Sequence, residues 1–379
     1  MRTSIRLQAC VVVNCATRVT STQGGDHYGE HHNSRHLPDP ALRPAHWTVR
    51  GSFRTPLTFQ NLMQPQNPSV TIRDVSTRSD WESAVRLRNT FFFQRPLTTD
   101  QLIEGATHHP KETRTRRTIM SVGGEDVSYG STIENYWSTT KGRFESQCMT
   151  RSLEFYVRHL DIECEAIVSL GGTKISTWQR TIDPEMLEAT VKRGFIETQR
   201  NPESALFLEK FDPEPYQQLI FRLRRQYDIM SYADFAHLSP ETWMHDAWRL
   251  EMDVMSDVPL PEPFSETPFE SWVKETESST VDTNALFIAL LDGTPIAMTQ
   301  LLPNTVDKTI IGTGLTGCRR DHRRRGLATG LKALSLAWAK ERGFKSVWTD
   351  NEVDNPMYGL NLKLGFERQF DFVCLELTV

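Results

Sequence analysis

The sequence lacks the features that would place the protein in a membrane or at a metal centre. No apolar run reaches the roughly 20 residues of a membrane-spanning helix, so no membrane partner is expected. The six cysteines are scattered, and no two have the C-x-x-C spacing of a metal site, so no bound metal is expected. Isolated reduced thiols in a chain of this size are typical of a cytoplasmic protein.

An excess of positive charge is missing as well. The formal net charge is −5, whereas binding to nucleic acid depends on a basic surface that displaces counterions. We therefore expect no nucleic-acid partner, although basic residues are concentrated locally at 319–325.

Residues 1–68 lack the apolar periodicity of folded segments and are rich in glycine, serine, proline, arginine and histidine. We predict a disordered tail. Its histidine cluster, which could bind metal only adventitiously, consists of His27, His31, His32 and His36. Met63 precedes the first strand-like segment, so a start of the chain at that methionine is a second interpretation.

After residue 68 the sequence presents one order of elements twice. In the first copy, a strand at 70–75 precedes a helix in which Ser79 and Glu82 have capping-box spacing. A hairpin is predicted around a Gly-Gly turn, followed by strands at 164–170 and 204–211.

The second copy repeats this order. One helix is predicted to begin with Ser239 as its N-cap, another with Thr267 and Glu270 as a capping box, and a hairpin turns at Asp292–Gly293. Helices and strands follow to the final strand at 371–379.

The clearest echo between the copies is a helix that ends at glycine just before a strand begins with phenylalanine. It reads KRGF at 192–195 and KLGF at 363–366, where glycine suits a left-handed helix C-cap. Together with the element order, it predicts a tandem repeat of an α/β domain. The predicted parts are a domain at 69–211, a linker at 212–227 and a domain at 228–379.

The segment RRDHRRRGLATG, residues 319–330, packs five arginines between a predicted strand and an amphipathic helix. The apolar face of that helix consists of Leu327, Leu331, Leu334 and Trp338. A helix N-terminus presents free backbone N–H groups and the positive end of the helix dipole. The junction therefore predicts an anion site suited to a pyrophosphate.

Spacing decides among the phosphate-binding families. A Walker loop and the G-x-G-x-x-G fingerprint are both absent. The pattern [Q/R]-x-x-G-x-[G/A], here Arg323 to Ala328, resembles the pyrophosphate loop of the GNAT acetyltransferase superfamily. The resemblance covers 228–379 well and 69–211 more weakly, a layout similar to tandem GNAT proteins such as mycothiol synthase.

The resemblance implies a fold and a co-substrate. Each domain would be a mixed, mostly antiparallel twisted sheet flanked by helices on both faces, and acetyl-CoA would bind where the fourth and fifth strands splay apart. Backbone groups of Thr316, Cys318 and Arg320 would pair with the pantetheine arm. The pyrophosphate would be held at Arg323, Arg324, Arg325, Gly326, Leu327, Ala328 and Thr329. Asn355 and Asn361 would add polar contacts, with capping or turn formation as their alternative role.

The first copy departs from this pattern, because it has no arginine loop and no glycine between Gly142 and Gly171. We expect that the first domain does not bind acetyl-CoA and instead supports the fold or walls the acceptor cleft.

Direct attack of an amine on the thioester needs a proton acceptor and a group that stabilises the leaving thiolate. Many members of the resembled family use a tyrosine as the acid, at the position held here by Asn361, and Tyr358 one turn earlier could substitute. Asp350 at the end of a strand is the candidate base. Further acidic residues nearby together suggest a cationic acceptor: Glu251, Asp253, Asp257, Glu266 and Glu270. Of these, Glu270 is discounted as a base because it is expected to form a capping box.

The leading hypothesis is an N-acetyltransferase for the amine of a small molecule, acting as a monomer or homodimer. The alternatives are a non-catalytic acyl-CoA-binding or sensor protein, motivated by Asn361, and nucleic-acid binding through the arginines.

Overall fold

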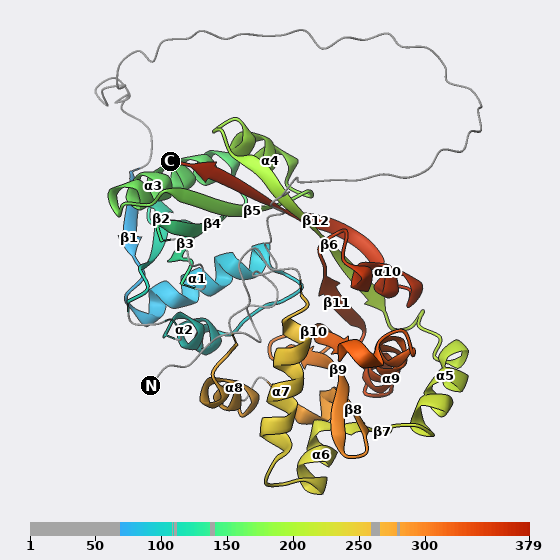
Figure 1. Ribbon diagram of the computed structural model, residues 1–379. Coiled ribbons are helices and arrows are strands. Elements are labelled where there is room, and N and C mark those ends of the chain that lie inside the picture. Colours follow the sequence, from blue (N-terminus) through green and yellow to red (C-terminus); the bar gives the residue numbers. More distant parts are fainter. Residues whose placement is uncertain (1–68, 108, 110–111, 137–140, 259–265, 279–280) are drawn as a thin grey trace, which may run out of the picture. The chain divides into compact units, whose positions relative to one another are not determined.

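The computed structural model describes residues 69–107, 109, 112–136, 141–258, 266–278 and 281–379 (Figure 1). The predicted tail, its histidine cluster and Met63 lie outside these residues. Val70–Val379 fall within one compact unit.

The first half of the chain alternates strands and helices. Its elements are β1 Val70–Asp74, α1 Arg78–Phe91, α2 Thr99–Thr107, β2 Thr115–Val122, β3 Glu125–Glu134, β4 Arg143–Met149, α3 Leu153–Ser169, β5 Lys174–Arg180, α4 Pro184–Val191 and β6 Ile196–Phe207.

The second half repeats this order after a further helix. Its elements are α5 Glu214–Arg224, β7 Asp228–Ser231, α6 Tyr232–Leu238, α7 Trp243–Met255, α8 Phe269–Thr276, β8 Leu286–Leu291, β9 Thr294–Pro303, β10 Ile310–Cys318, α9 Leu327–Glu341, β11 Ser346–Asp350, α10 Pro356–Lys363 and β12 Glu367–Thr378.

All the described strands join one 12-stranded sheet in the order β1-β2-β3-β4-β5-β12-β6-β11-β10-β9-β8-β7. Two neighbouring pairs, β4–β5 and β10–β11, are parallel. The two final strands are exchanged: β12 lies between β5 and β6, while β6 lies between β12 and β11. Figure 1 shows β12 running from the second half to its end beside β5. The predicted division at 211 and 228 stays a prediction, since the sheet continues across it.

Helices cover both faces of the sheet, as the alternation along β8 shows. Ile288 and Leu290 pack into a core with α7, whereas Phe287 and Ala289 pack into another with α9. Apolar side chains on both faces of a strand require a cover on each side. The predicted fold class, a mixed α/β structure with a twisted sheet flanked by helices, is confirmed.

The glycines that echo between the halves have the same conformation. Gly194 has φ of 90° and Gly365 has φ of 95°, and each stands between a helix and the strand that follows it. The predicted hairpin turn is also confirmed, because Asp292 and Gly293 both have positive φ, as a type I′ turn requires.

The strand predicted at 164–170 is wrong, because these residues form the last turns of α3. Tyr156, Leu160 and Ile167 recur at helical spacing and are buried together. A short apolar run does not by itself distinguish a strand from a buried helix. The strand that pairs with β4 in this half is instead β5, at 174–180.

Three predicted helix starts are also wrong. The capping box of α1 is formed by Thr77 and Asp80, two residues before the predicted pair. Ser239 is the C-cap of α6, and α8 begins after Pro268 without a side-chain cap. Several Ser, Thr and acidic residues stand near each start, so spacing alone selects the wrong set.

Candidate functional site

The second half contains an opening between two parallel strands. β10 and β11 pair only over Ile310–Gly312 and Ser346–Trp348. Beyond these pairs the strands diverge, and the Thr313 hydroxyl donates to the Thr349 hydroxyl at 2.6 Å. On its other edge β10 stays paired with β9 as far as Cys318. The edge of β10 that faces β11 can therefore receive an extended ligand.

The opening leads to the start of α9. A short turn at Arg320–His322 is followed by Arg324 and Gly326, which have φ of 61° and 85°. α9 then begins at Leu327, and Gly326 as its N-cap supplies no side-chain hydrogen bond. The backbone N–H groups in the first turn of the helix therefore make no hydrogen bond to a capping side chain. Free N–H groups at a helix N-terminus are an arrangement that binds anions.

Three of the five arginine side chains in the loop pair with carboxylates at the end of α7. Arg319 pairs with Asp253 at 3.1 Å, while Arg320 and Arg323 both contact Asp257, and these contacts tie the loop to the C-terminal end of α7. Ion pairing, first of all with Arg320, lowers the pKa of Asp257.

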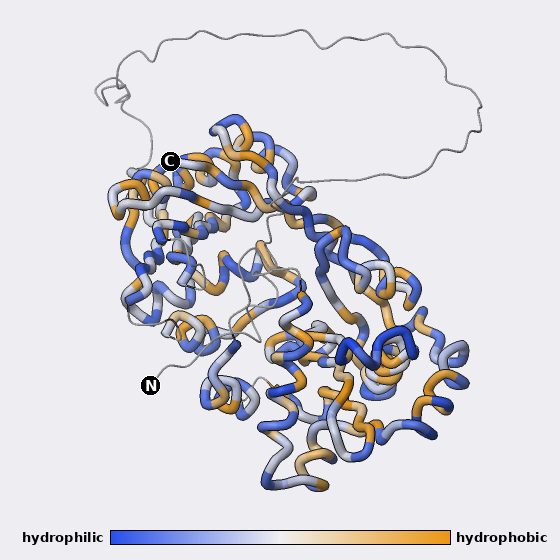
Figure 2. Tube along the Cα trace, in the orientation of Figure 1, coloured by the Kyte–Doolittle hydropathy of each residue, from blue (hydrophilic) through white to orange (hydrophobic). Residues whose placement is uncertain are grey.

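Arg324 forms no ion pair among the described residues, and Arg325 donates only to the Asp321 carbonyl, at 2.9 Å. Both side chains are exposed. Figure 2 shows the segment before α9 as a continuous hydrophilic stretch beside the hydrophobic helix.

The other residues predicted to bind a cofactor lie around this opening. The Thr316 hydroxyl bonds Thr299 at 2.8 Å, and Cys318 accepts from Arg323 through its carbonyl at 3.3 Å. Leu327 is buried, whereas Ala328 and Thr329 are half-buried in the first turn of α9.

Asp350, the candidate base, belongs to a buried ionic cluster. The Arg95 guanidinium lies 2.9 Å from Asp350 Oδ1 and 2.9 Å from Glu203 Oε2. Glu203 faces Asp350 across the β6–β11 pairing. Gln94 donates to Glu203 at 3.4 Å, and Asn201 to Asp350 at 3.4 Å. Two carboxylates from different halves thus share one guanidinium.

Burial raises the pKa of Glu203 to about 7, and it also raises the pKa of Asp350. The two carboxyls oppose each other's ionisation, and one guanidinium compensates only one negative charge. The pair therefore retains a proton at mildly acidic pH and releases it near neutrality.

Asn361 is fully buried on α10. Its Oδ1 accepts from the buried ammonium of Lys332, and its Nδ2 donates to Asn351 Oδ1 at 2.6 Å. Burial lowers the pKa of Lys332 to about 7. A chain of polar side chains thus runs from α9 through α10 to the end of β11.

The remaining two predicted residues on α10 have different surroundings. Asn355 caps the helix by accepting from the Met357 N–H at 2.9 Å, the alternative role stated for it above. Tyr358 is half-buried one turn before Asn361.

The other carboxylates of this half have local partners. Glu251 accepts from Gln300 at 3.0 Å, and Glu266 pairs with Arg249 at 3.2 Å. Glu270 is exposed on α8.

Across the described ranges, no group of three or more histidine, cysteine or acidic side chains could hold a metal ion. Among the same residues, no helix combines the length and the apolar character that crossing a bilayer demands.

The corresponding place in the first half is closed. β4 and β5 also pair over three residues, Arg143–Glu145 with Lys174–Ser176. Beyond them the Gln147 side chain bridges the strands: its amide donates to the Trp178 carbonyl at 2.8 Å and accepts from the Trp178 N–H at 3.1 Å. The following helix, α3, is capped by its own Ser152. The space between the strands that stays open in the second half is filled here by the Gln147 side chain, and the helix that follows carries its own side-chain cap.

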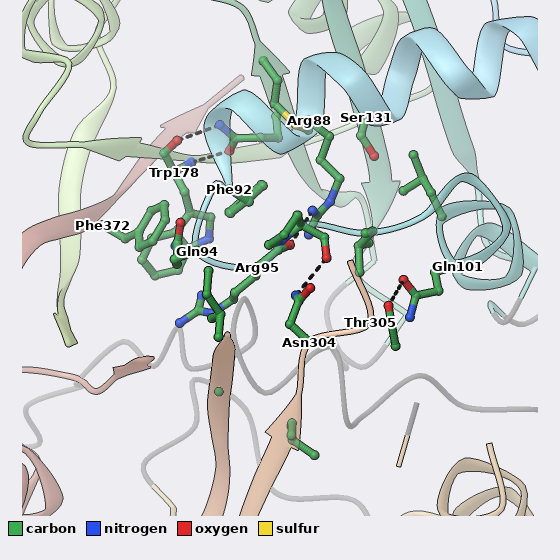
Figure 3. A pocket seen from close by; sticks show the side chains of 18 of the residues that line it. Arg88, Phe92, Gln94, Arg95, Gln101, Ser131, Trp178, Asn304, Thr305 and Phe372 are labelled. Carbon is green, nitrogen blue, oxygen red and sulfur yellow. Dashed lines mark hydrogen bonds between the residues drawn. The ribbon is translucent and has the colours of Figure 1, made fainter. Parts of the chain in front are cut away.

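A cavity of about 290 Å³ lies between α1, strands β3–β5 and strands β9–β10. Figure 3 shows Arg88 reaching into it from α1, with Phe92, Trp178 and Phe372 on its wall. It extends to Gly312 and Thr313, where β10 and β11 begin to diverge. The cavity therefore joins the first half of the chain to the opening in the second.

Four residues of the site were missed in the sequence. Lys332 had a visible signal, since it is a single charge inside an apolar run, where an uncompensated charge is costly. Glu203 had none, because polar residues and a proline surround it in the sequence. Arg95 and Gln147 also had none, because their roles depend on partners more than 30 residues away in the chain.

Comparisons with known proteins agree with this geometry. Residues 244–366 match the family model of the Acetyltransferase (GNAT) family. No curated protein matches the chain by sequence.

Solved structures resemble nearly the whole described fold. A tandem GNAT protein from the clavulanic acid biosynthesis pathway, solved without AcCoA, aligns with a TM-score of 0.62 at 16% identity, over 82% of this chain and 98% of that one. A GCN5-related N-acetyltransferase from Sphaerobacter thermophilus gives 0.59 at 13%, over 82% and 95%. A GNAT-family acetyltransferase from Colwellia psychrerythraea gives 0.51 at 12%, over 81% and 100%. At such identities the likeness shows the fold.

Proposed function

We propose that the protein transfers acetyl from acetyl-CoA to the amine of a small molecule, and that residues 244–366, which match the Acetyltransferase (GNAT) family model, form the domain that does so. The observation that carries the proposal is the opening between β10 and β11, which leads to the uncapped first turn of α9.

In this proposal the opening receives the pantetheine arm along the β10 edge, at Thr316 and Cys318, and the first turn of α9 binds the pyrophosphate. Arg320 and Arg323 hold the loop through Asp257. Arg324 and Arg325 are exposed and supply charge to the phosphates. No metal is needed, because amine attack on a thioester requires only proton transfer and charge stabilisation.

The amine attacks the acetyl carbonyl carbon, a C–N bond forms, the C–S bond breaks, and the electron pair leaves on sulfur. The attacking nitrogen must lose protons, and we assign the acceptor to the Asp350–Glu203 pair. Tyr358 is the candidate donor to the leaving thiolate. Asn361 supports the end of β11 through Asn351 and is itself held by Lys332.

The first half takes no acetyl-CoA in this proposal. Gln147 fills the space between β4 and β5 by bonding the Trp178 backbone, and Ser152 caps the helix turn that corresponds to the pyrophosphate site. This half instead contributes Arg95 and Glu203 to the proton-accepting cluster and lines the cavity next to it.

A sensor that binds acyl-CoA without turnover is the second candidate, favoured by the complete engagement of the Asn361 amide within the protein. Release of free thiol from acetyl-CoA in the presence of a panel of amines separates the two. Binding without amine-dependent thiol release would support the sensor.

The anion site is tested with Gly326→Glu, which adds a negative charge at the N-cap of α9. Acetyl-CoA affinity, measured by calorimetry, should fall by at least about a hundredfold, because a carboxylate would repel the pyrophosphate where charge-assisted hydrogen bonds now attract it. The substitution should leave the fold intact, because a Cβ at Gly326 would contact only the flexible side chain of Leu219, at 2.9 Å.

The matched control is Gly343→Glu at the other end of α9. Gly343 has φ of 81° and nothing within 4 Å of a built Cβ, so the variant carries the same backbone strain away from the loop. Retained affinity in the Gly326 variant, or equal loss in both variants, would overturn the assignment.

A further inference from the structure

We infer that the cavity between α1 and strands β9–β10 binds an acceptor that carries a carboxylate, and that Arg88 is the residue that pairs with it. The acceptor is then a small apolar amino acid or a molecule of that class. This inference rests on the proposed acetyl transfer and identifies the substrate class of that site.

Arg88 lies half-buried in the cavity wall without a carboxylate partner. Its NH1 donates to the Arg95 carbonyl at 2.9 Å and to Asn89 Oδ1 at 3.2 Å, and its guanidinium lies 4.8 Å from the ring centroid of Phe92. Among the described residues it forms no ion pair. Its remaining donors face the cavity, where a partly desolvated cation favours an anion.

The charge of Arg88 persists in this environment. Burial lowers the pKa of Arg88 to about 10, so the guanidinium is still protonated at neutral pH. Arg95 lies close enough to oppose its charge, but the Arg95 guanidinium is compensated by Asp350 and Glu203, so Arg88 is the cation available to a ligand. One acidic side chain, Glu145, also lines the cavity, and burial raises its pKa to about 7.

Three further polar atoms of residues that line the cavity have no partner. They are Arg95 NH1, Gln94 Oε1 and Trp178 Nε1, each buried without a hydrogen bond. Buried polar atoms without partners are rare and costly. These side chains add unsatisfied polar groups to the wall that Arg88 shares.

Much of the remaining wall is apolar, although Gln101, Ser131, Gln147, Asn304 and Thr305 also line the cavity. The apolar part includes Phe92, Leu97, Leu102, Met149, Trp178 and Phe372. A volume of about 290 Å³ is at the lower end of small-molecule sites. It suits one amino acid with an apolar side chain rather than a peptide.

Arg88 and the proton-accepting pair meet at one part of the cavity. Arg88 reaches in from α1, while Arg95, which contacts Asp350, lies beside it (Figure 3). The cavity also reaches Gly312 and Thr313 at the opening of β10. An amino acid with its carboxylate at Arg88 would hold its amine, on the adjacent carbon, close to Arg95 and to the carboxyl pair behind it.

The test measures binding to the full chain by calorimetry without acetyl-CoA. The probes are L-leucine and L-phenylalanine with their matched amides, L-leucinamide and L-phenylalaninamide, which keep the amine and lose the carboxylate. We expect at least one acid to bind about tenfold or more tightly than its amide. In Arg88→Gln this preference should fall to about onefold, and in Arg88→Lys, which keeps the charge, part of it should remain.

The matched control is Arg86→Gln on the same helix, where the side chain is exposed and does not line the cavity. Its preference for acids should equal that of the wild type. Equal binding of acids and amides to the wild type, or a preference that survives in Arg88→Gln, would overturn the inference. Acetyl-CoA affinity of each variant checks its fold; if the wild type fails to bind acetyl-CoA, the proposed function is what fails.

Discussion

Single residues determine the charge balance of the site, and Asp350 shows how. Asp350 and Glu203 compete for the one guanidinium of Arg95, and both carboxyl side chains are almost fully buried. When the two carboxyls share one proton, their single negative charge equals the positive charge of the guanidinium. The same shortage of positive charge that destabilises both carboxylates makes them proton acceptors near neutral pH.

Asp350→Asn should lower kcat/KM for the amine acceptor by about a hundredfold or more, because the proton acceptor is lost while Arg95 and Glu203 remain as a balanced pair. In the wild type kcat/KM should rise with pH through an apparent pKa near 7, since the deprotonated pair is the active form. The variant should lose this rise. Glu188→Gln, on an exposed carboxylate of α4 that pairs with Lys192, should change neither the rate nor the pH profile.

The same raised pKa predicts how stability depends on pH. The folded protein holds the proton of Glu203 up to about pH 7, whereas the unfolded chain releases it near 4.3, so the free energy of unfolding should fall as pH rises between these values. Glu203→Gln should reduce this fall. Urea unfolding at several pH values measures it, and an equal slope in both proteins would show that Glu203 titrates normally.

At the scale of elements, the two halves place similar strands in similar positions and use them differently. β4–β5 and β10–β11 each pair over three residues and then diverge. One divergence is filled by the Gln147 amide and the other is open. The two halves therefore differ here in the Gln147 side chain and in the arginine loop before α9, while the order of their strands is the same.

Gln147→Ala should lower the free energy of unfolding by about 1–3 kcal/mol, because the N–H and the carbonyl of Trp178 lose their partner. The variant should not gain acetyl-CoA affinity in the first half, since α3 keeps its Ser152 cap. Gln369→Ala serves as the control, because that amide is exposed and bonds only a nearby carbonyl. A loss as small as that of the control would contradict the role of Gln147.

The sequence predicted those elements whose signals are local. The glycines before Phe195 and Phe366, the turn at Asp292–Gly293 and the junction before α9 all depend on residues within a few positions of one another. The helix at 164–169 was missed because an apolar run fits two periods. The cluster around Arg95 could not be predicted, because it joins residues from both halves and depends on strand exchange.

At the scale of the whole chain, the exchange of β6 and β12 joins the halves through backbone hydrogen bonds. β12 pairs with β5 from Phe372 to Thr378 and contributes Val373 and Leu375 to the core of the first half. Removing residues 372–379 should therefore unfold the sheet around β4 and β5, although these strands belong to the other half. Hydrogen exchange of residues 143–180 measures this, and unchanged protection would contradict it.

The exchanged strands also limit how a substrate can enter. Two lobes joined by a flexible segment can swing apart and close again, but β5, β12, β6 and β11 are hydrogen-bonded in succession. Separating them would break these ladders at a cost close to that of unfolding. For the proposed acetyl transfer, we therefore expect substrate entry and product release to require rearrangement of local segments at the rim of the cavity, while the sheet stays intact.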